Sequence, residues 1–175
     1  MQTRVTALFL AILAMLAIGA GDAAMADELE DRLAAAVVLA PSDDALDRIG
    51  RIDAVLGAYA QAGLIGTKPD FRIHYDDYYV LRRPARFRGY TLAAIEVENM
   101  GEFIGCCVDE GVILLLRDDG GGDEGDLDEF AGRSGCRTLG YLDAALGRNK
   151  QHTARRFPKG EYVSLSCRVH DADNR

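Results

Sequence analysis

The chain has 175 residues, of which 49% are hydrophobic and 27% charged, with 28 acidic against 20 basic side chains and a net charge of −8. A domain of this length buries roughly 70% of its unfolded surface, so neither a metal nor a disulfide is obligatory for folding. The average charged fraction excludes a long disordered protein. The acidic excess argues against a general nucleic-acid-binding protein, since contacts to phosphates require a basic surface.

The first 26 residues have the pattern of a secretory signal peptide. Arg4 precedes an apolar run over residues 5–18, and small residues follow up to an A-x-A site that ends at Ala26. As a helix, this run measures about 21 Å against a hydrocarbon core of roughly 30 Å, so an uncleaved anchor is the less favoured alternative. We expect cleavage after Ala26, or failing that after Ala23. The product is then exported to the periplasm or the extracellular space without a stable membrane anchor.

Residues 27–66 are predicted to form an N-terminal helical hairpin. Apolar residues recur at helical spacing from Leu29 to Ala40, where Pro41 follows and ends the helix. Ser42 can cap a second helix, whose apolar residues recur as far as Tyr59. We interpret the hairpin as a scaffold that covers one side of a core.

Residues 67–175 have the pattern of a β-rich domain, and the expected fold class is α+β. The run 112–116 is apolar without interruption, which predicts a strand buried on both faces. A helix is expected over residues 139–146, where leucines recur at helical spacing. The hairpin and this part are expected to form one compact unit. Further strands are predicted at residues 71–75, 78–81, 90–97, 103–108 and 162–169.

All four cysteines lie in the part expected to be exported, at Cys106, Cys107, Cys136 and Cys167. An oxidising compartment favours disulfides, and the spacing does not fit a zinc site. Adjacent cysteines rarely bridge each other, which leaves the pairings 106–136 with 107–167, or 106–167 with 107–136. Neighbours in a strand point to opposite faces, and Ile104 and Val108 place Cys106 on the inward face. The alternation therefore favours Cys106–Cys167 with Cys107–Cys136.

The segment 118–129 holds seven carboxylates and four glycines but no basic residue. Carboxylate oxygens suit calcium, yet Asp123 stands where an EF-hand requires its glycine. Gly120, Gly122 and Gly125 spell G-x-G-x-x-G, but the phosphates of a dinucleotide would meet these carboxylates. We interpret the segment as a solvated, mobile loop, with calcium binding as the alternative. No metal site and no cofactor are predicted.

Positive charge is concentrated beside aromatic rings in the segment 82–90. Guanidinium groups next to such rings suit a carboxylated, phosphorylated or acidic-protein partner. The alternative is that these charges, like those of a second basic stretch at residues 148–159, are solvated and pair with the acidic segments. The candidate partner-binding residues are Arg82, Arg83, Arg86, Phe87, Arg88 and Tyr90.

Motifs typical of enzymes are sparse. His74, His152 and His170 lie in unrelated segments without H-E-x-x-H, and no G-x-S-x-G elbow occurs. Catalytic groups can assemble in space, so a secreted hydrolase is the alternative function. We expect instead a non-catalytic binding protein with an inhibitor or immunity type of role. Its expected partner is an acidic protein or an anionic polymer of the cell envelope, and not nucleic acid.

Two short motifs mark strand starts in the β-rich part. Arg86-Phe87-Arg88-Gly89-Tyr90 opens one strand, and Lys159-Gly160-Glu161-Tyr162-Val163 leads into the last. With the hinge at Gly111, this order resembles that of exported bacterial OB-fold proteins of the tRNA-anticodon-like group. The resemblance implies a small, mainly antiparallel OB-like barrel that binds a partner. The acidic segment and the adjacent cysteines depart from that group, and a fold analogy alone specifies no function.

Overall fold

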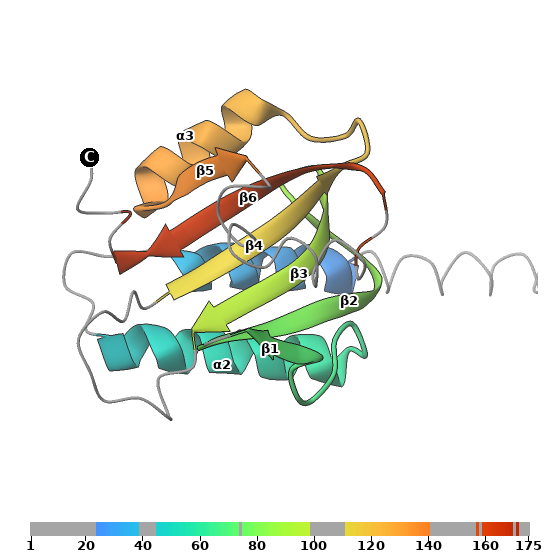
Figure 1. Cartoon of the computed structure of the whole chain (residues 1–175), viewed down its shortest axis with the longest axis vertical. Helices are drawn as coiled ribbons and strands as arrows, with labels where there is room; N and C mark the ends of the chain where they lie inside the picture. The colour runs from blue at the N-terminus through green and yellow to red at the C-terminus, as the bar shows by residue number, and fades with distance from the viewer. Residues whose placement is uncertain are drawn as a thin grey trace, which may run out of the picture.

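The computed structural model describes residues 24–38, 45–73, 75–98, 111–140, 157, 159–169 and 171, with the backbone alone for residues 45–49. This part of the chain is α+β, as predicted, and consists of three helices and a six-stranded antiparallel sheet (Figure 1). The helices span residues 24–37, Ala45–Gln61 (α2) and Glu124–Ser134 (α3). The strands are β1 (Phe71–Ile73), β2 (Asp76–Phe87), β3 (Tyr90–Glu98), β4 (Gly111–Asp118), β5 (Arg137–Gly140) and β6 (Glu161–Arg168).

The sheet is open. Its strand order is β1-β2-β3-β4-β6-β5, and every neighbouring pair runs antiparallel. In the described residues β1 and β5 form the two edges, so the closed, OB-like barrel expected from the sequence is not confirmed. What the strand pattern predicted correctly is the antiparallel arrangement.

The two predicted N-terminal helices are confirmed, and both pack on the sheet. Leu33 and Val37 of the first helix and Tyr59 of α2 are almost fully buried. They share one hydrophobic cluster with Leu114 of β4 and Leu165 of β6. Burial of these side chains on one sheet face explains the helical spacing of apolar residues. In the described part of the chain, no helix is long and apolar enough to cross a membrane.

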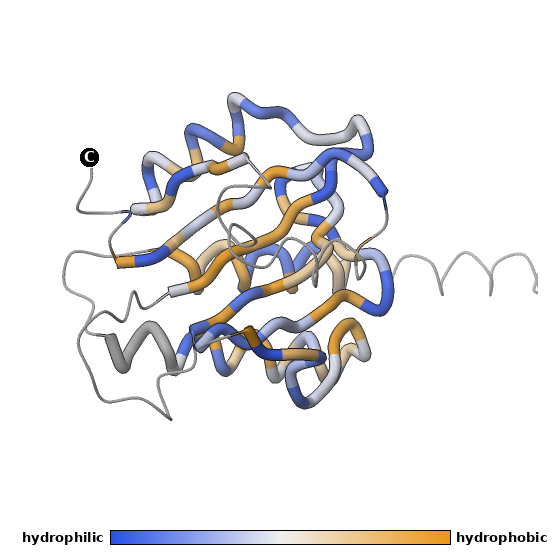
Figure 2. The backbone as a smooth tube through the Cα atoms, viewed as in Figure 1, coloured by the Kyte–Doolittle hydropathy of each residue, from blue (hydrophilic) through white to orange (hydrophobic). Residues whose placement is uncertain are grey.

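Strand β4 is central and buried on both faces, as its apolar run predicts. Residues 112–116 expose at most 4% of their surface. Leu114 and Leu116 belong to the cluster beneath the helices, whereas Leu115 packs with Ala94 on the opposite face. Figure 2 shows hydrophobic residues concentrated in the central strands and hydrophilic ones along α3. A continuous apolar run is what a strand covered on both faces requires.

Strand β2 extends beyond the predicted run 78–81 and includes most of the arginine-rich segment. Pro84 lies at a register shift between Val80 and Ala85, where the loss of a ladder hydrogen bond is tolerated. The strand ends at a two-residue turn formed by Arg88 (φ 51) and Gly89 (φ 79). Positive φ at both positions is typical of a type I′ hairpin turn, which matches the twist of the flanking strands.

Gly89→Ala is expected to lower the free energy of unfolding by about 1–3 kcal/mol. A Cβ at Gly89 would collide with the carbonyl oxygen of Gly121, and the positive φ disfavours any side chain. Urea unfolding of the variant and the wild type measures this loss. Gly57→Ala in α2 is the matched control, because a Cβ there meets nothing within 4 Å and alanine favours a helix. Equal stability of the Gly89 variant and the wild type would contradict this turn geometry.

The interpretation of residues 118–129 as a mobile loop is wrong for its second half, which begins α3. Asp123 caps the helix by accepting a hydrogen bond from the Asp126 backbone N–H at 2.9 Å. Glu124 and Asp126 then occupy the first turn, where the helix dipole stabilises carboxylates, and Gly135 (φ 77) ends the helix. The acidic residues are thus those of a capped amphipathic helix. Its buried side chains are Leu127, Phe130, Ala131 and Ser134.

The disulfide pairing expected from the sequence is wrong. Cys136 and Cys167 form a disulfide with a Cα–Cα distance of 4.2 Å. Cys167 does face the core, as predicted, but Arg137 pairs with Ser166 across β5 and β6, which brings Cys136 opposite Cys167. Neither pairing expected from the sequence contains this bond, because each gives the two adjacent cysteines separate partners. Cys106 and Cys107 lie outside the described residues.

Two further expectations concern the segments that join these strands. Leu139, placed by spacing at the start of a helix, lies in β5 instead, and residues 141–146 lie outside the described residues. The strand predicted at residues 103–108 also lies outside them. The last predicted strand is confirmed as β6.

Candidate functional site

The candidate partner-binding residues divide into a buried set and an exposed set. Phe87 and Tyr90 are 0% and 4% exposed and belong to the main hydrophobic cluster. Phe87 packs edge-on against Phe130 of α3, with ring centroids 5.6 Å apart. These two rings stabilise the β2–β3 hairpin and present no surface to a partner.

Arg88 also has an intramolecular role. Its Nη1 lies 3.1 and 3.2 Å from the two carboxylate oxygens of Asp126, and its guanidinium lies 4.5 Å above the Phe130 ring. Its backbone N–H donates to the Glu30 carboxylate at 2.7 Å. Arg88 therefore joins the hairpin turn to α3 and to the first helix. The sequence analysis gave pairing with the acidic segments as the alternative to partner binding, and Arg88 makes such a pair with Asp126.

Arg82, Arg83 and Arg86 are exposed on β2, and we call them the arginine surface. The Arg82 guanidinium lies 3.7 Å from the Asp70 carboxylate and stays 58% exposed. Arg83 donates to the carbonyl of Ala62, and Arg86 donates to the carbonyl of Gly89 at 2.8 Å. A carbonyl orients a guanidinium without neutralising its charge, so Arg83 can still attract an anion, whereas the charge of Arg86 already acts on Asp119.

A cavity of about 250 Å³ opens beside Arg83. Its floor comes from the first helix, from the end of α2 and its following turn, and from β2. The Tyr59 hydroxyl donates to the Leu29 carbonyl at 3.4 Å. Burial, and to a lesser extent the charge of Glu30, raise the pKa of Tyr59, so its phenol is neutral and the cavity holds no second charge from it. The floor residues are Leu29, Tyr59, Leu64 and Ala85, and the rim residues are Met25, Ala26, Arg83 and Pro84.

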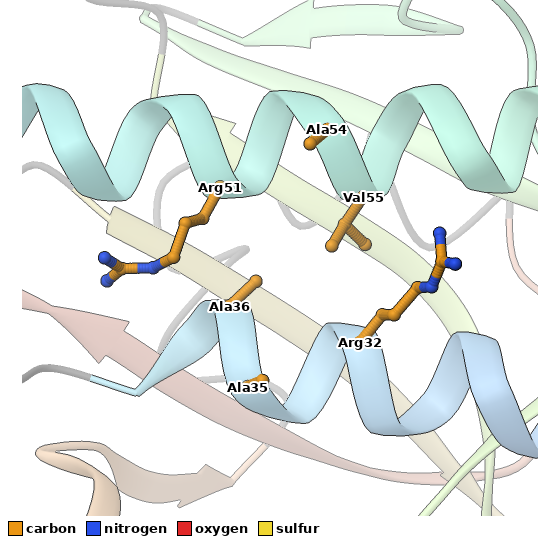
Figure 3. A pocket seen from close by; sticks show the side chains of 6 residues that line it. All are labelled: Arg32, Ala35, Ala36, Arg51, Ala54 and Val55. Carbon is orange, nitrogen blue, oxygen red and sulfur yellow. The ribbon is translucent and has the colours of Figure 1, made fainter.

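A second hollow, of about 330 Å³, lies between the first helix and α2 (Figure 3). Small side chains line its centre, and Arg32 and Arg51 flank it. Arg32 pairs with Glu28 at 2.6 Å, and Arg51 donates to the carbonyl of Val38 at 3.4 Å. Both arginines thus bond within the helical hairpin. The small residues at the centre are Ala35, Ala36, Ala54 and Val55.

The sheet face opposite the helices carries a buried ionisable cluster. Glu96 of β3 is 3% exposed, and its Oε1 accepts a hydrogen bond from Arg168 Nη2 at 2.5 Å. The same Nη2 lies 3.0 Å from the Asp76 carboxylate, and the Tyr78 hydroxyl is a further hydrogen-bond partner of Glu96. Among the described residues, Oε2 of Glu96 has no hydrogen-bond partner.

Burial dominates the protonation of this cluster. Desolvation, followed by the like charge of Asp76, raises the pKa of Glu96 to about 8, although Arg168 opposes the shift. Burial also raises the pKa of Tyr78, and the neighbouring Glu96 adds to that effect. Strongly shifted carboxyls occur at catalytic sites and in structural ion-pair networks alike.

A second buried carboxylate belongs to the same region of the fold. Asp171 is 3% exposed and accepts hydrogen bonds from the Ser166 hydroxyl at 2.6 Å and the Arg168 backbone N–H at 2.9 Å. Arg137 lies 2.5 Å from its other oxygen. These contacts fasten residue 171 to β5 and β6.

The acidic residues before α3 are engaged in local contacts. Asp118 accepts from the Gly120 backbone N–H at 2.7 Å, and Asp119 pairs with Arg117 at 2.8 Å. Hydrogen bonding to Arg117 also lowers the pKa of Asp119. Within the described ranges, no group of three potential ligand residues is arranged to hold a metal ion.

Comparison with known proteins gives no relative. No family model, no curated protein and no solved structure matches the chain. The resemblance to exported OB-fold proteins therefore stays a prediction. The function has to be argued from the described residues themselves.

The sequence did not reveal the cavity or the Glu96 cluster. The cavity combines residues from three separate segments, and no single-segment pattern marks it. Glu96 carried a usable signal, because a glutamate between Ile95 and Val97 in a buried strand needs a compensating partner. Its partner, Arg168, is distant in sequence, and only the pairing of β4 with both β3 and β6 brings the two strands together.

Proposed function

We propose that this protein is an exported, non-catalytic binding protein whose arginine surface holds an acidic segment of another protein. The observation that carries the proposal is the exposure of Arg82, Arg83 and Arg86 on one strand. Guanidinium groups form bidentate pairs with carboxylates, and groups fixed on a strand lose less freedom on binding than groups on a loop.

The cavity beside Arg83 favours a protein over an anionic envelope polymer. Its floor is apolar, and it lies directly next to a positive charge. Proteins place apolar side chains beside carboxylates, and buried apolar anchors dominate many protein interfaces. A polymer that is polar throughout would leave this floor unused.

Export is the second part of the proposal. The Cys136–Cys167 disulfide supports it, because disulfides persist mainly in oxidising compartments. Removal of the predicted signal peptide after Ala26 would release the protein into the periplasm or the extracellular space. An inhibitor or immunity type of role fits a small exported protein that binds another protein. The proposed function does not require an OB-like fold. The relationship to OB-fold proteins is a separate proposal, and it rests only on the two strand-opening motifs.

The triple variant R82A/R83A/R86A is expected to weaken the binding of an acidic peptide by about tenfold or more, since exposed charge pairs contribute up to about 1 kcal/mol each. The probe is a synthetic peptide of glutamates around one phenylalanine, and fluorescence anisotropy at several salt concentrations gives its affinity. The variant is also expected to lose most of the salt dependence of binding.

The matched control removes the same charge elsewhere. Arg32, Arg133 and Lys159 are exposed and lie outside the arginine surface, so R32A/R133A/K159A is expected to bind the peptide like the wild type. Equal losses in the two triple variants would mean that only the net charge matters. That result would contradict a binding site on β2.

A further inference from the structure

The cavity beside Arg83 has the features of a receptor for one side chain. At about 250 Å³ it is smaller than the roughly 300–1,000 Å³ typical of small-molecule pockets. Its floor residues Leu29, Tyr59, Leu64 and Ala85 are each less than 10% exposed, and all but Leu64, which lies in the turn after α2, come from helices and a strand. Such a floor keeps its shape and favours an apolar group over water.

Positive charge is present at the rim of this cavity. Arg83 stands at the rim and is fixed by its hydrogen bond to the Ala62 carbonyl. Arg82 precedes it on β2 and is exposed. The Glu30 carboxylate accepts a hydrogen bond from the Arg88 backbone N–H, and its charge also acts on Tyr59, so a carboxylate of the ligand is favoured only on the Arg83 side. A ligand that fits this pattern has an apolar group with negative charge beside it.

We infer that the cavity receives one apolar side chain, aromatic or long aliphatic, from the acidic segment that the arginine surface binds. A carboxylate next to that side chain pairs with Arg83. This inference rests on the proposed function and adds the feature that selects one acidic segment over others. Charge alone would accept any acidic peptide, whereas a buried anchor discriminates by shape and apolar area.

Signal-peptide cleavage after Ala26 would change the rim of this site but not its floor. It removes Met25 and Ala26 from the rim but keeps Arg83 and all four floor residues. The exported, processed protein is the form to test, with its N-terminus verified by mass spectrometry.

Three peptides that differ at defined positions test the inference on the unmodified protein. The first has a phenylalanine flanked by glutamates, the second has serine in its place, and the third keeps the phenylalanine but has glutamines. We expect the first to bind at least about tenfold more tightly than the second, as burial of an aromatic side chain predicts. The third should bind much more weakly than the first.

A cavity-filling variant provides the second arm. Ala85→Leu places extra carbons on the floor and is expected to abolish the preference for phenylalanine while leaving the serine peptide bound. Ala35→Leu, which adds the same carbons in the hollow between the helices, should keep the preference. The peptide comparison needs no variant, so the inference can still be refuted if A85L does not fold.

The outcomes separate the inference from the function on which it rests. Equal affinity for the phenylalanine and serine peptides, with both lost in R82A/R83A/R86A, would overturn the inference and leave the proposed function standing. No binding of either acidic peptide would overturn both. Undiminished binding of the glutamine peptide would show that the site is purely apolar, and this too would overturn the inference. The inference would also be overturned if octanoate displaced the first peptide and no preference for phenylalanine were found, because that result indicates a small-molecule site.

Discussion

Replacing Cys136 and Cys167 together by alanine is expected to lower the free energy of unfolding by about 3–4 kcal/mol. The disulfide spans 31 residues of sequence, so it restricts the unfolded chain substantially. Both cysteines are buried, and alanine avoids placing a hydroxyl in the core. Urea unfolding under oxidising conditions measures the loss as a lower midpoint.

The adjacent cysteines provide the control for this prediction. C106A/C107A should retain the Cys136–Cys167 linkage, which peptide mapping by mass spectrometry identifies directly. A reducing agent should remove the stability difference between the wild type and C136A/C167A. A peptide that links Cys106 or Cys107 to Cys136 or Cys167 would contradict the observed pairing.

Glu96→Gln is expected to change how stability depends on pH. Burial raises the pKa of Glu96 from 4.5 to about 8, so the folded protein binds this proton more tightly than the unfolded chain does. The stabilising contribution is therefore complete below about pH 4.5 and is lost as the pH rises towards 8, by on the order of 3–4 kcal/mol. Glutamine keeps a hydrogen-bond acceptor for Arg168 and Tyr78 but carries no titrating proton.

The measurement is the free energy of unfolding of both proteins between pH 5 and pH 8. We expect the stability of Glu96→Gln relative to the wild type to increase across this range. Parallel curves for Glu96→Gln and the wild type would mean that the Glu96 carboxyl does not titrate in this window.

Local periodicity predicted the elements whose packing it directly reflects. An apolar stripe, as in residues 29–37, indicates a helix buried on one face. An uninterrupted apolar run, as in residues 112–116, indicates a strand buried on both faces. The Arg88-Gly89 turn was not identified, because the arginine-rich segment before it was interpreted by its charge. Its strand character depends on pairing with β3, including a register shift that accommodates Pro84.

Long-range pairing was less accessible from the sequence. Cys136 meets Cys167 because β5 and β6 are neighbours at the sheet edge, and nothing in the cysteine spacing specifies that order. The acidic segment was misjudged for a different reason. Asp123 is a helix cap and Gly135 a helix end, but the density of carboxylates between them concealed the short apolar stripe of Leu127 and Phe130.

The sequence identified the arginine-rich segment but not which of its residues are exposed. Arg82, Arg83 and Arg86 are exposed, as a binding surface requires, whereas the aromatic residues Phe87 and Tyr90 belong to the core. An aromatic ring beside arginines has the same sequence signature in a core and on a surface. The apolar element next to the charge is instead the cavity, whose floor no single segment could reveal.

The most direct measurement of the proposed function is a calorimetric titration of the processed protein with the glutamate–phenylalanine peptide at low ionic strength, repeated at high salt. We expect saturable one-to-one binding whose affinity falls steeply as salt screens the arginine surface. The absence of binding at low ionic strength, or an affinity that does not change with salt, would contradict it.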